Sequence, residues 1–273
     1  MAECNTLFKE QYFVGWNVGG WNCARNRNSR DAIVILNRKN QIVGIPWRGN
    51  FSPTINSANS QADFITSLFS LCQTEYTGGH ITLAIDAPLG FSEHFYDLLT
   101  GGFVDCDTAN ALNPYLFRYT ERFLAEWGYT PLSPIKDMIG SQATKGMHTL
   151  AKFVPNIQQA GVWQSDDMTA VEAYPSPCAH SVIFDKIQKS AGLDWCINEI
   201  GEEQLVDHRL PTQDHIDAFT CALVAKLFVE QPEMLRFPDK LTPHREGWIF
   251  LPTDCFNEKN RKNQFLISEE LQG

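Results

Sequence analysis

Three short apolar runs constrain the fold of this chain more than any other feature of its sequence. They occupy residues 12–18, 32–36 and 81–86, and Gly, Asn or Pro follows each of them closely. Apolar, β-branched runs of this length between turn residues are typical of buried strands. A further run at 42–45 follows a turn rich in Asn and Lys, and another at 168–174 is stopped by prolines. The sequence therefore predicts a sheet that begins with three meandering strands.

Segments with helical periodicity alternate with these strands. Apolar residues recur at helical spacing over 62–72, a helical stretch begins near Ala179, and the last strong element spans 213–230. On that final helix, one face carries Asp214, Asp217, Ala218, Cys221, Ala225 and Phe228. The two aspartates therefore continue the apolar stripe, and we expect both to point toward the sheet.

The pattern becomes irregular between the strand at 81–86 and the strand at 168–174. A helix is predicted at 111–127, whereas the Gly-containing stretch at 139–147 reads as a loop. No internal repeat is present. We interpret residues 1–273 as a single α/β domain with a helical and loop insertion at about 92–167.

Composition disfavours several classes of function. The chain has 22 Lys and Arg against 32 Asp and Glu, a net charge of −10, so tight nonspecific coating of DNA is not expected. Its eight cysteines form no C-x-x-C pair and no zinc-like spacing with histidine. The chain also lacks a signal-like N-terminus and any stretch of eighteen apolar residues. These features predict a cytoplasmic protein with reduced thiols and no membrane partner.

Four acidic residues stand at the ends or on the inner faces of separate elements. Asp86 closes one strand, Glu172 lies in a later one, and Asp214 and Asp217 lie on the final helix. Clustered carboxylates suit Mg²⁺ or Mn²⁺, because these hard cations prefer oxygen ligands. Two such ions about 3.5 to 4 Å apart can bind a phosphodiester and generate a hydroxide. The pattern favours metal-dependent chemistry on a phosphate ester.

Each carboxylate also has a structural interpretation. Asp86 before Ala-Pro can form an Asx turn, and Asp214 stabilises a helix N-terminus by its charge. Glu172 is equally well explained as a solvent-facing strand residue. Asp217 is the strongest candidate, because an unpaired carboxylate on an apolar helix face costs several kcal/mol.

Two further features suggest phosphate contact. Gly19 and Gly20 follow the first strand, and glycines let a backbone approach a phosphate closely, although a plain two-glycine turn explains them equally well. Arg118, Glu121 and Arg122 are spaced for ion pairing on a solvated helix face. The alternative to this structural interpretation is that Arg118 contacts a phosphate of the substrate.

Six motifs together resemble an uncharacterised family described as predicted RNase H-like nucleases. The motifs are VGWNVGGW at 14–21, AIDAPLGF at 84–91, FRYTERF at 117–123, VEAYPSP at 171–177, DHIDAFTCAL at 214–223 and EGWIFLP at 246–252. They cover most of the chain in the family's order. The resemblance implies an RNase H-like fold, in which a mixed sheet of five strands carries helices on both faces, and it extends distantly to the active-site layout of Holliday-junction resolvases.

The resemblance also implies the site and the activity. It assigns Asp86, Asp214 and Asp217 as metal ligands, Glu172 as a ligand or base, and Mg²⁺ or Mn²⁺ as cofactor of a nuclease or phosphodiesterase acting on nucleic acid or another phosphorylated substrate. The chain departs from this pattern at Asn17, where the first strand would carry Asp. Asn17 can still offer a carbonyl oxygen to a metal, but without the charge that attracts a second ion.

Two alternatives remain open at this point. One is a noncatalytic module that binds nucleic acid or nucleotide and lost its chemistry with the first Asp. The other is a relative of actin-like ATPases and sugar kinases, which is disfavoured because those need two duplicated domains. The sequence also leaves open whether residues 92–167 form a lid or the interface of a homodimer.

Overall fold

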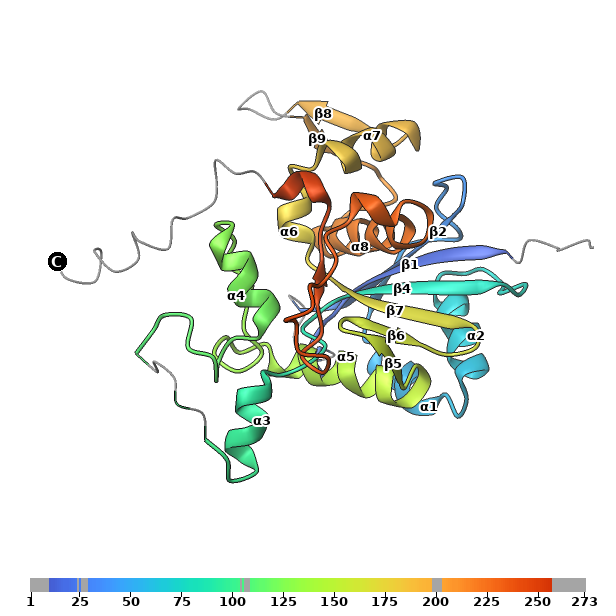
Figure 1. The fold of residues 1–273 in the computed structure, drawn as a ribbon. Helices are drawn as coiled ribbons and strands as arrows, with labels where there is room; N and C mark the ends of the chain where they lie inside the picture. Colours follow the sequence, from blue (N-terminus) through green and yellow to red (C-terminus); the bar gives the residue numbers. More distant parts are fainter. Residues whose placement is uncertain are drawn as a thin grey trace, which may run out of the picture.

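The computed structural model describes residues 10–23, 25, 29–103, 105, 109–197 and 203–256. These residues form an α/β structure with one main mixed sheet, helices on both of its faces and a separate two-stranded sheet (Figure 1). The strands are β1 (Gln11–Asn17), β2 (Asp31–Asn37), β3 (Trp47–Gly49), β4 (His80–Asp86), β5 (Asn156–Gln159), β6 (Val162–Gln164), β7 (Met168–Ala173), β8 (Trp195–Ile197), β9 (Glu203–Leu205) and β10 (Ile249–Phe250). The α-helices are α1 (Ser52–Ser57), α2 (Gln61–Leu71), α3 (Glu93–Leu99), α4 (Tyr119–Glu126), α5 (Gly140–Phe153), α6 (Pro175–Cys178), α7 (Val182–Ser190) and α8 (Gln213–Glu230), and the 3-10 helices are η1 (Pro232–Met234) and η2 (Thr253–Cys255).

The main sheet has the strand order β3-β2-β1-β4-β7-β6-β5, and β10 pairs with β7. The pairs β1–β4, β4–β7 and β7–β10 are parallel, whereas β1–β2, β2–β3, β6–β7 and β5–β6 are antiparallel. The predicted meander of three strands is therefore confirmed. The expected total of five strands is too small, because the described residues place eight in this sheet.

The third strand of the meander lies later than predicted. Residues 42–45 form only an isolated bridge, between Ile42 and Leu36, and the strand itself is β3. Gly44 has a φ of +70°, which interrupts an extended backbone. Pro46 then lacks the N–H that a ladder requires.

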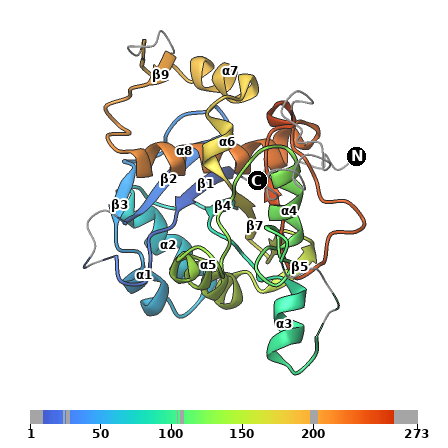
Figure 2. The same cartoon turned by 90° about the vertical axis from the view of Figure 1, so that its left-hand side faces the viewer.

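Helices pack on both faces of the sheet, as predicted. Figures 1 and 2 place α8 on one side of the strands and α1, α2 and α5 on the other. Alternate residues of each strand supply the two cores: Phe13 and Ala84 belong to the core beneath α8, while Trp16 and Ile85 belong to the core shared with α2 and α5. This alternation decides which strand-end side chains can meet.

Helix α8 has the bounds that the sequence predicts and lies directly on β1. A Cβ atom at Gly15 would come within 1.8 Å of the carbonyl oxygen of Ala218, so only glycine permits this approach. Ten consecutive residues from Ala218 to Leu227 are buried. Its first turns, which carry Asp214 and Asp217, are partly exposed at the carboxyl ends of β1 and β4.

The segment at 92–167 contains more regular structure than the sequence indicates. The Gly-containing stretch predicted as a loop is α5, and β5 and β6 form a hairpin that joins the main sheet through β7. The predicted helix at 111–127 is shortened to α4, because Asn113 caps a turn at Tyr115 and the Glu121 carboxylate accepts a hydrogen bond from the backbone N–H of Arg118 at the start of the helix. Helix α3 has no buried residue.

Among the described residues, no helix combines the length and hydropathy needed to cross a membrane.

Candidate functional site

Asn17 and Asp86 lie side by side at the ends of two parallel strands. They are register partners, as the last residues of β1 and β4. Because side chains alternate along a strand, both share the face of Phe13 and Ala84, which α8 covers. Both are partly exposed. The structure therefore places the first-strand residue Asn17 beside Asp86.

Asp217 lies above these strand ends. It occupies the second turn of α8, next to Ala218, whose backbone contacts β1. Burial raises the pKa of Asp86 well above its ordinary value, and the negative charges of Asp217 and Glu172 raise it further. Burial also raises the pKa of Asp217, and the negative charge of Asp214 raises it further. The side chain of Gln213 donates a 2.8 Å hydrogen bond to the Asp217 carboxylate, which lowers this pKa. The charge of Asp217 thus destabilises the charged form of Asp86.

Asp214 does not join this pair. Its carboxylate accepts a 2.5 Å hydrogen bond from Nε of Arg48, which lies on β3. Both helix aspartates are predicted to point toward the sheet, and the partner of Asp214 does lie on a strand of that sheet, whereas its role as a metal ligand stays a prediction. Arg48 neutralises Asp214 on the β3 side of the helix, whereas Asp217 interacts with Asp86 on the β4 side.

Glu172 lies on the opposite face of the sheet from Asp86. It pairs with Ile85 in the ladder, and it therefore shares the face of that residue. Its carboxylate is 2% exposed and accepts two hydrogen bonds from Arg118, at 2.6 and 2.8 Å, and one from the backbone N–H of Leu89. The interpretation of Glu172 as a solvent-facing strand residue is wrong, and the role of metal ligand or base stays a prediction.

Arg118 is fully buried rather than exposed on a solvated helix face. Its guanidinium donates to Glu121, to both oxygens of Glu172 and to the carbonyl of Glu246. Burial lowers the pKa of Arg118, and the neighbouring carboxylates outweigh that effect and raise it overall. A guanidinium that is 0% exposed has no surface for the predicted phosphate contact. It instead ties α4 to β7 and to the segment before β10.

The glycine turn after β1 binds a carboxylate of the protein itself. The backbone N–H of Gly19 donates to Asp31, which also accepts hydrogen bonds from Trp16 Nε1, the N–H of Phe51 and Nζ of Lys145. Asp31 and Lys145 are both fully buried, 2.6 Å apart. Gly20 donates weakly, at 3.5 Å, to Ser29. The sequence suggested that the backbone of Gly19 and Gly20 binds a phosphate. In the structure the carboxylate of Asp31 is the anion that Gly19 binds.

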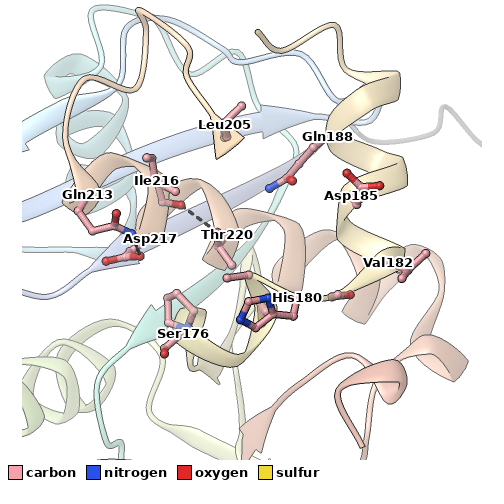
Figure 3. A pocket seen from close by; sticks show the side chains of 14 residues that line it. Ser176, His180, Val182, Asp185, Gln188, Leu205, Gln213, Ile216, Asp217 and Thr220 are labelled. Atoms are coloured by element: carbon pink, nitrogen blue, oxygen red, sulfur yellow. Dashed lines mark hydrogen bonds between the residues drawn. The ribbon is translucent and has the colours of Figure 1, made fainter. Parts of the chain in front are cut away.

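A cleft of about 630 Å³ opens beside Asp217. One wall is the start of α8, and the opposite wall is α7 with the end of α6 (Figure 3). Tyr174, between β7 and α6, links the cleft to the strand ends. Burial raises the pKa of Tyr174, and the charge of Asp86 raises it further. A hydrogen bond with Ser176, which lines the cleft, lowers it.

The side chains that remain in place for a cation are Asp86, Asp217 and Asn17. All three offer oxygen, which fits Mg²⁺ or Mn²⁺ and does not fit a thiolate or imidazole metal. In the described part of the chain no Lys or Arg side chain pairs with either carboxylate. Among all the residues that the structure describes, no three or more His, Cys, Asp or Glu side chains are arranged to bind a metal. A bound cation would therefore depend on the amide oxygen of Asn17 and on water or substrate oxygens.

Sequence reasoning missed three residues of this region: Tyr174, Gln213 and Arg48. The first lies within the VEAYPSP motif, and Gln213 stands four positions before Asp217, a spacing that brings side chains together on a helix. The sequence therefore contained a signal for both Tyr174 and Gln213. The pairing of Arg48 with Asp214 joins positions 166 apart, and no local signal indicates it.

Comparisons with known proteins add no assignment: no family model, no curated protein and no solved structure matches this chain.

Proposed function

We propose that this protein is a metal-dependent phosphodiesterase, a nuclease of RNase H-like type. One observation carries the proposal: Asn17, Asp86 and Asp217 gather on one face of the sheet at the ends of parallel strands, and no basic side chain of the described residues neutralises the two carboxylates. A carboxylate whose pKa is raised by burial and by a neighbouring carboxylate attracts a divalent cation.

The RNase H-like assignment draws on two supports. The central strand order β3-β2-β1-β4-β7, with an antiparallel meander followed by two strands parallel to β1, agrees with the sheet that the family resemblance implies. The six motifs provide the second support, since they place Asp86 and Asp217 in the family's order. Fold alone does not fix activity, so the chemistry has to come from the side chains.

In this proposal the carboxylates of Asp86 and Asp217 bind one Mg²⁺ or Mn²⁺ ion, with the amide oxygen of Asn17 as a third ligand. The bound ion would polarise the phosphoryl oxygen and activate water. Gln213 orients Asp217 through its 2.8 Å hydrogen bond. A single ion fits better than two, because Arg48 already neutralises Asp214 and Arg118 already neutralises Glu172.

A noncatalytic binding module is the second candidate, and the same pairings favour it. Of the four acidic residues predicted for the site, two have internal cationic partners, and Asn17 brings no charge. Binding without turnover is the outcome that this candidate predicts. Asn17→Asp would then increase metal affinity, because it adds a third carboxylate beside Asp86.

The experiment is isothermal titration of Mn²⁺ into the wild type and matched Asp-to-Asn variants. We expect Asp86→Asn and Asp217→Asn to lose binding, and Asp214→Asn to keep it, because Arg48 already occupies that carboxylate. Asp166→Asn is the matched control, since Asp166 is exposed in the turn before β7, at the other end of that strand. Equal binding by the wild type and Asp217→Asn would refute the metal site.

Hydrolysis is then measured with single-stranded, hybrid and branched nucleic acids in Mn²⁺ or Mg²⁺. Turnover that disappears in Asp217→Asn and persists in Asp166→Asn supports the phosphodiesterase. Metal binding without turnover of any of these substrates supports the binding module instead.

A further inference from the structure

The cleft beside Asp217 has the size and position of a substrate site. Its volume of about 630 Å³ falls within the roughly 300 to 1,000 Å³ of small-molecule sites. Asp217 itself forms part of the lining. Whatever occupies the cleft therefore lies next to the proposed cation, which makes the chemistry of the remaining lining informative about the substrate.

That lining contains no Lys or Arg among the described residues. Its charged groups are Asp185 on α7 and Asp217 on α8, which lie on opposite walls (Figure 3). A phosphate inside the cleft would meet two carboxylates and no Lys or Arg side chain, and the imidazole of His180 is the remaining group of this described lining that can carry a positive charge. We therefore expect a phosphate at the Asp217 end, where a divalent ion would offset its charge.

The rest of the lining suits an uncharged, flat, polar group. Ile216, Leu205 and Val182 supply apolar surface, while Gln188 and Gln213 supply amide groups from α7 and α8. Figure 3 shows the side chain of Gln188 extending from α7 toward α8. An amide offers a donor and an acceptor together, which is the pattern of a nucleobase edge. Asp185 accepts hydrogen bonds from hydroxyl or amino groups.

We propose that the cleft binds the nucleoside unit of an unpaired nucleotide, with the adjoining phosphodiester at Asp217 and Asp86. The position of the phosphate in this inference rests on the proposed function. The nucleoside site is inferred from the cleft alone. A base in a duplex would have to leave its stack to enter, at a cost of about a few kcal/mol. The substrate is therefore a single strand or a short oligonucleotide rather than a duplex.

The acidity of the protein points the same way. A duplex binds chiefly through phosphate contacts with Lys and Arg. The chain has a net charge of −10, and none of the described residues that line the cleft is Lys or Arg. A nucleoside pocket with one metal-bound phosphate needs no such surface.

The first test uses nucleosides without phosphate, so that it does not depend on any metal. Adenosine, cytidine and uridine are titrated into the full-length wild type, Gln188→Ala and Ile216→Trp, with Lys186→Ala as control on the exposed side of α7. We expect Gln188→Ala to weaken binding about threefold to tenfold, as for one hydrogen bond. Ile216→Trp fills the cleft and abolishes binding. Absence of nucleoside binding to the wild type at millimolar concentration would overturn the proposal.

The second test separates this proposal from the metal site. Mn²⁺ affinity is measured in the same variants, and we expect Gln188→Ala to match the wild type. Unchanged Mn²⁺ binding together with absent nucleoside binding refutes the cleft alone. Nucleoside binding that Gln188→Ala weakens, with no Mn²⁺ binding by the wild type, refutes the proposed function and supports the cleft. Equal cleavage rates for a single strand and its duplex would also contradict the inference.

Discussion

Asp86 is the last residue of β4 and Glu172 is the second-last residue of the adjacent β7, and this offset of one register position puts their carboxylates on opposite faces of the sheet. Ile85, not Asp86, is the partner of Glu172 in the ladder. Asp86 therefore faces α8 and Asp217, whereas Glu172 faces Arg118. One acidic residue is available to a cation and the other stabilises the fold, although both stand at the carboxyl ends of parallel strands.

Replacing Asp86 by Asn is expected to stabilise the protein at neutral pH. The folded-state pKa of Asp86 is raised, so the folded state retains a proton that the unfolded chain releases near a pKa of about 3.9. The free energy of unfolding of the wild type therefore falls, relative to the variant, as pH rises from about 4. Urea unfolding from pH 4 to 8 measures the difference.

At pH 8 we expect the variant to have the higher Tm, by about 2–4 °C per kcal/mol in a protein of this size. Mn²⁺ should stabilise the wild type and leave Asp86→Asn unchanged, because only the former binds the ion. An Asp86→Asn protein that is less stable than the wild type at pH 8 would show that the charged carboxylate stabilises the fold.

Arg118→Ala is expected to destabilise the fold by about 3–5 kcal/mol, because it leaves Glu121 and Glu172 buried without a cation. Arg38→Ala is the comparison, since Arg38 is 55% exposed and 3.5 Å from Glu230. An exposed pair of this kind contributes at most about 1 kcal/mol. Equilibrium unfolding in urea decides between the two magnitudes, and similar losses would mean that the buried network contributes little.

Gly15→Ala is expected to displace α8 and weaken Mn²⁺ binding together. The new Cβ would lie 1.8 Å from the carbonyl oxygen of Ala218, one residue from Asp217, and backbone cannot yield to it cheaply. Overpacking typically costs about 1–3 kcal/mol. Gly140→Ala is the matched control, because its Cβ would meet only the carbonyl oxygen of Pro134 at 3.4 Å. Thermal unfolding and Mn²⁺ titration of both variants give the result.

Five buried cysteines should resist alkylation until the protein unfolds. Cys23, Cys72, Cys178, Cys221 and Cys255 are all buried. Burial raises the pKa of the Cys72 thiol to about 12, and it also raises the pKa of Cys178 and Cys221, so few thiolates exist at neutral pH. Iodoacetamide followed by peptide mass spectrometry should find these sites unmodified in the native protein and modified in guanidinium. Rapid native labelling of Cys72 would contradict its burial.

The elements that sequence predicted well are those whose pattern is continuous. Helix α8 is apolar over most of its length, and β1, β2 and β4 are compact apolar runs between turn residues. Helix α5 was missed because Gly140 and Gly146 suggested a loop. Gly146 instead lies in the helix, packed closely against Leu89, whose side chain a Cβ atom there would approach to 2.8 Å.

The candidate site was predictable where it depends on local order. Asp86 and Asn17 end neighbouring parallel strands, so their meeting follows from the fold. The partners of Arg118 and Asp214 come from residues 54 and 166 positions away, and no local pattern encodes such pairings. These pairings give Glu172 and Asp214 cationic partners within the protein, and their roles as metal ligands stay predictions.

The position of α8 over β1 and β2 also determines when the protein can finish folding during its synthesis. Nζ of Lys226 donates to the carbonyl oxygen of Arg38 across 188 positions, so the strands leave the ribosome long before the helix that covers them. At translation rates of about 5–20 residues per second, that interval is on the order of ten to forty seconds. During it, the core on the α8 face of the sheet lacks the helix that covers it. Asp217 lies on α8, so the candidate site can form only after that helix has been synthesised.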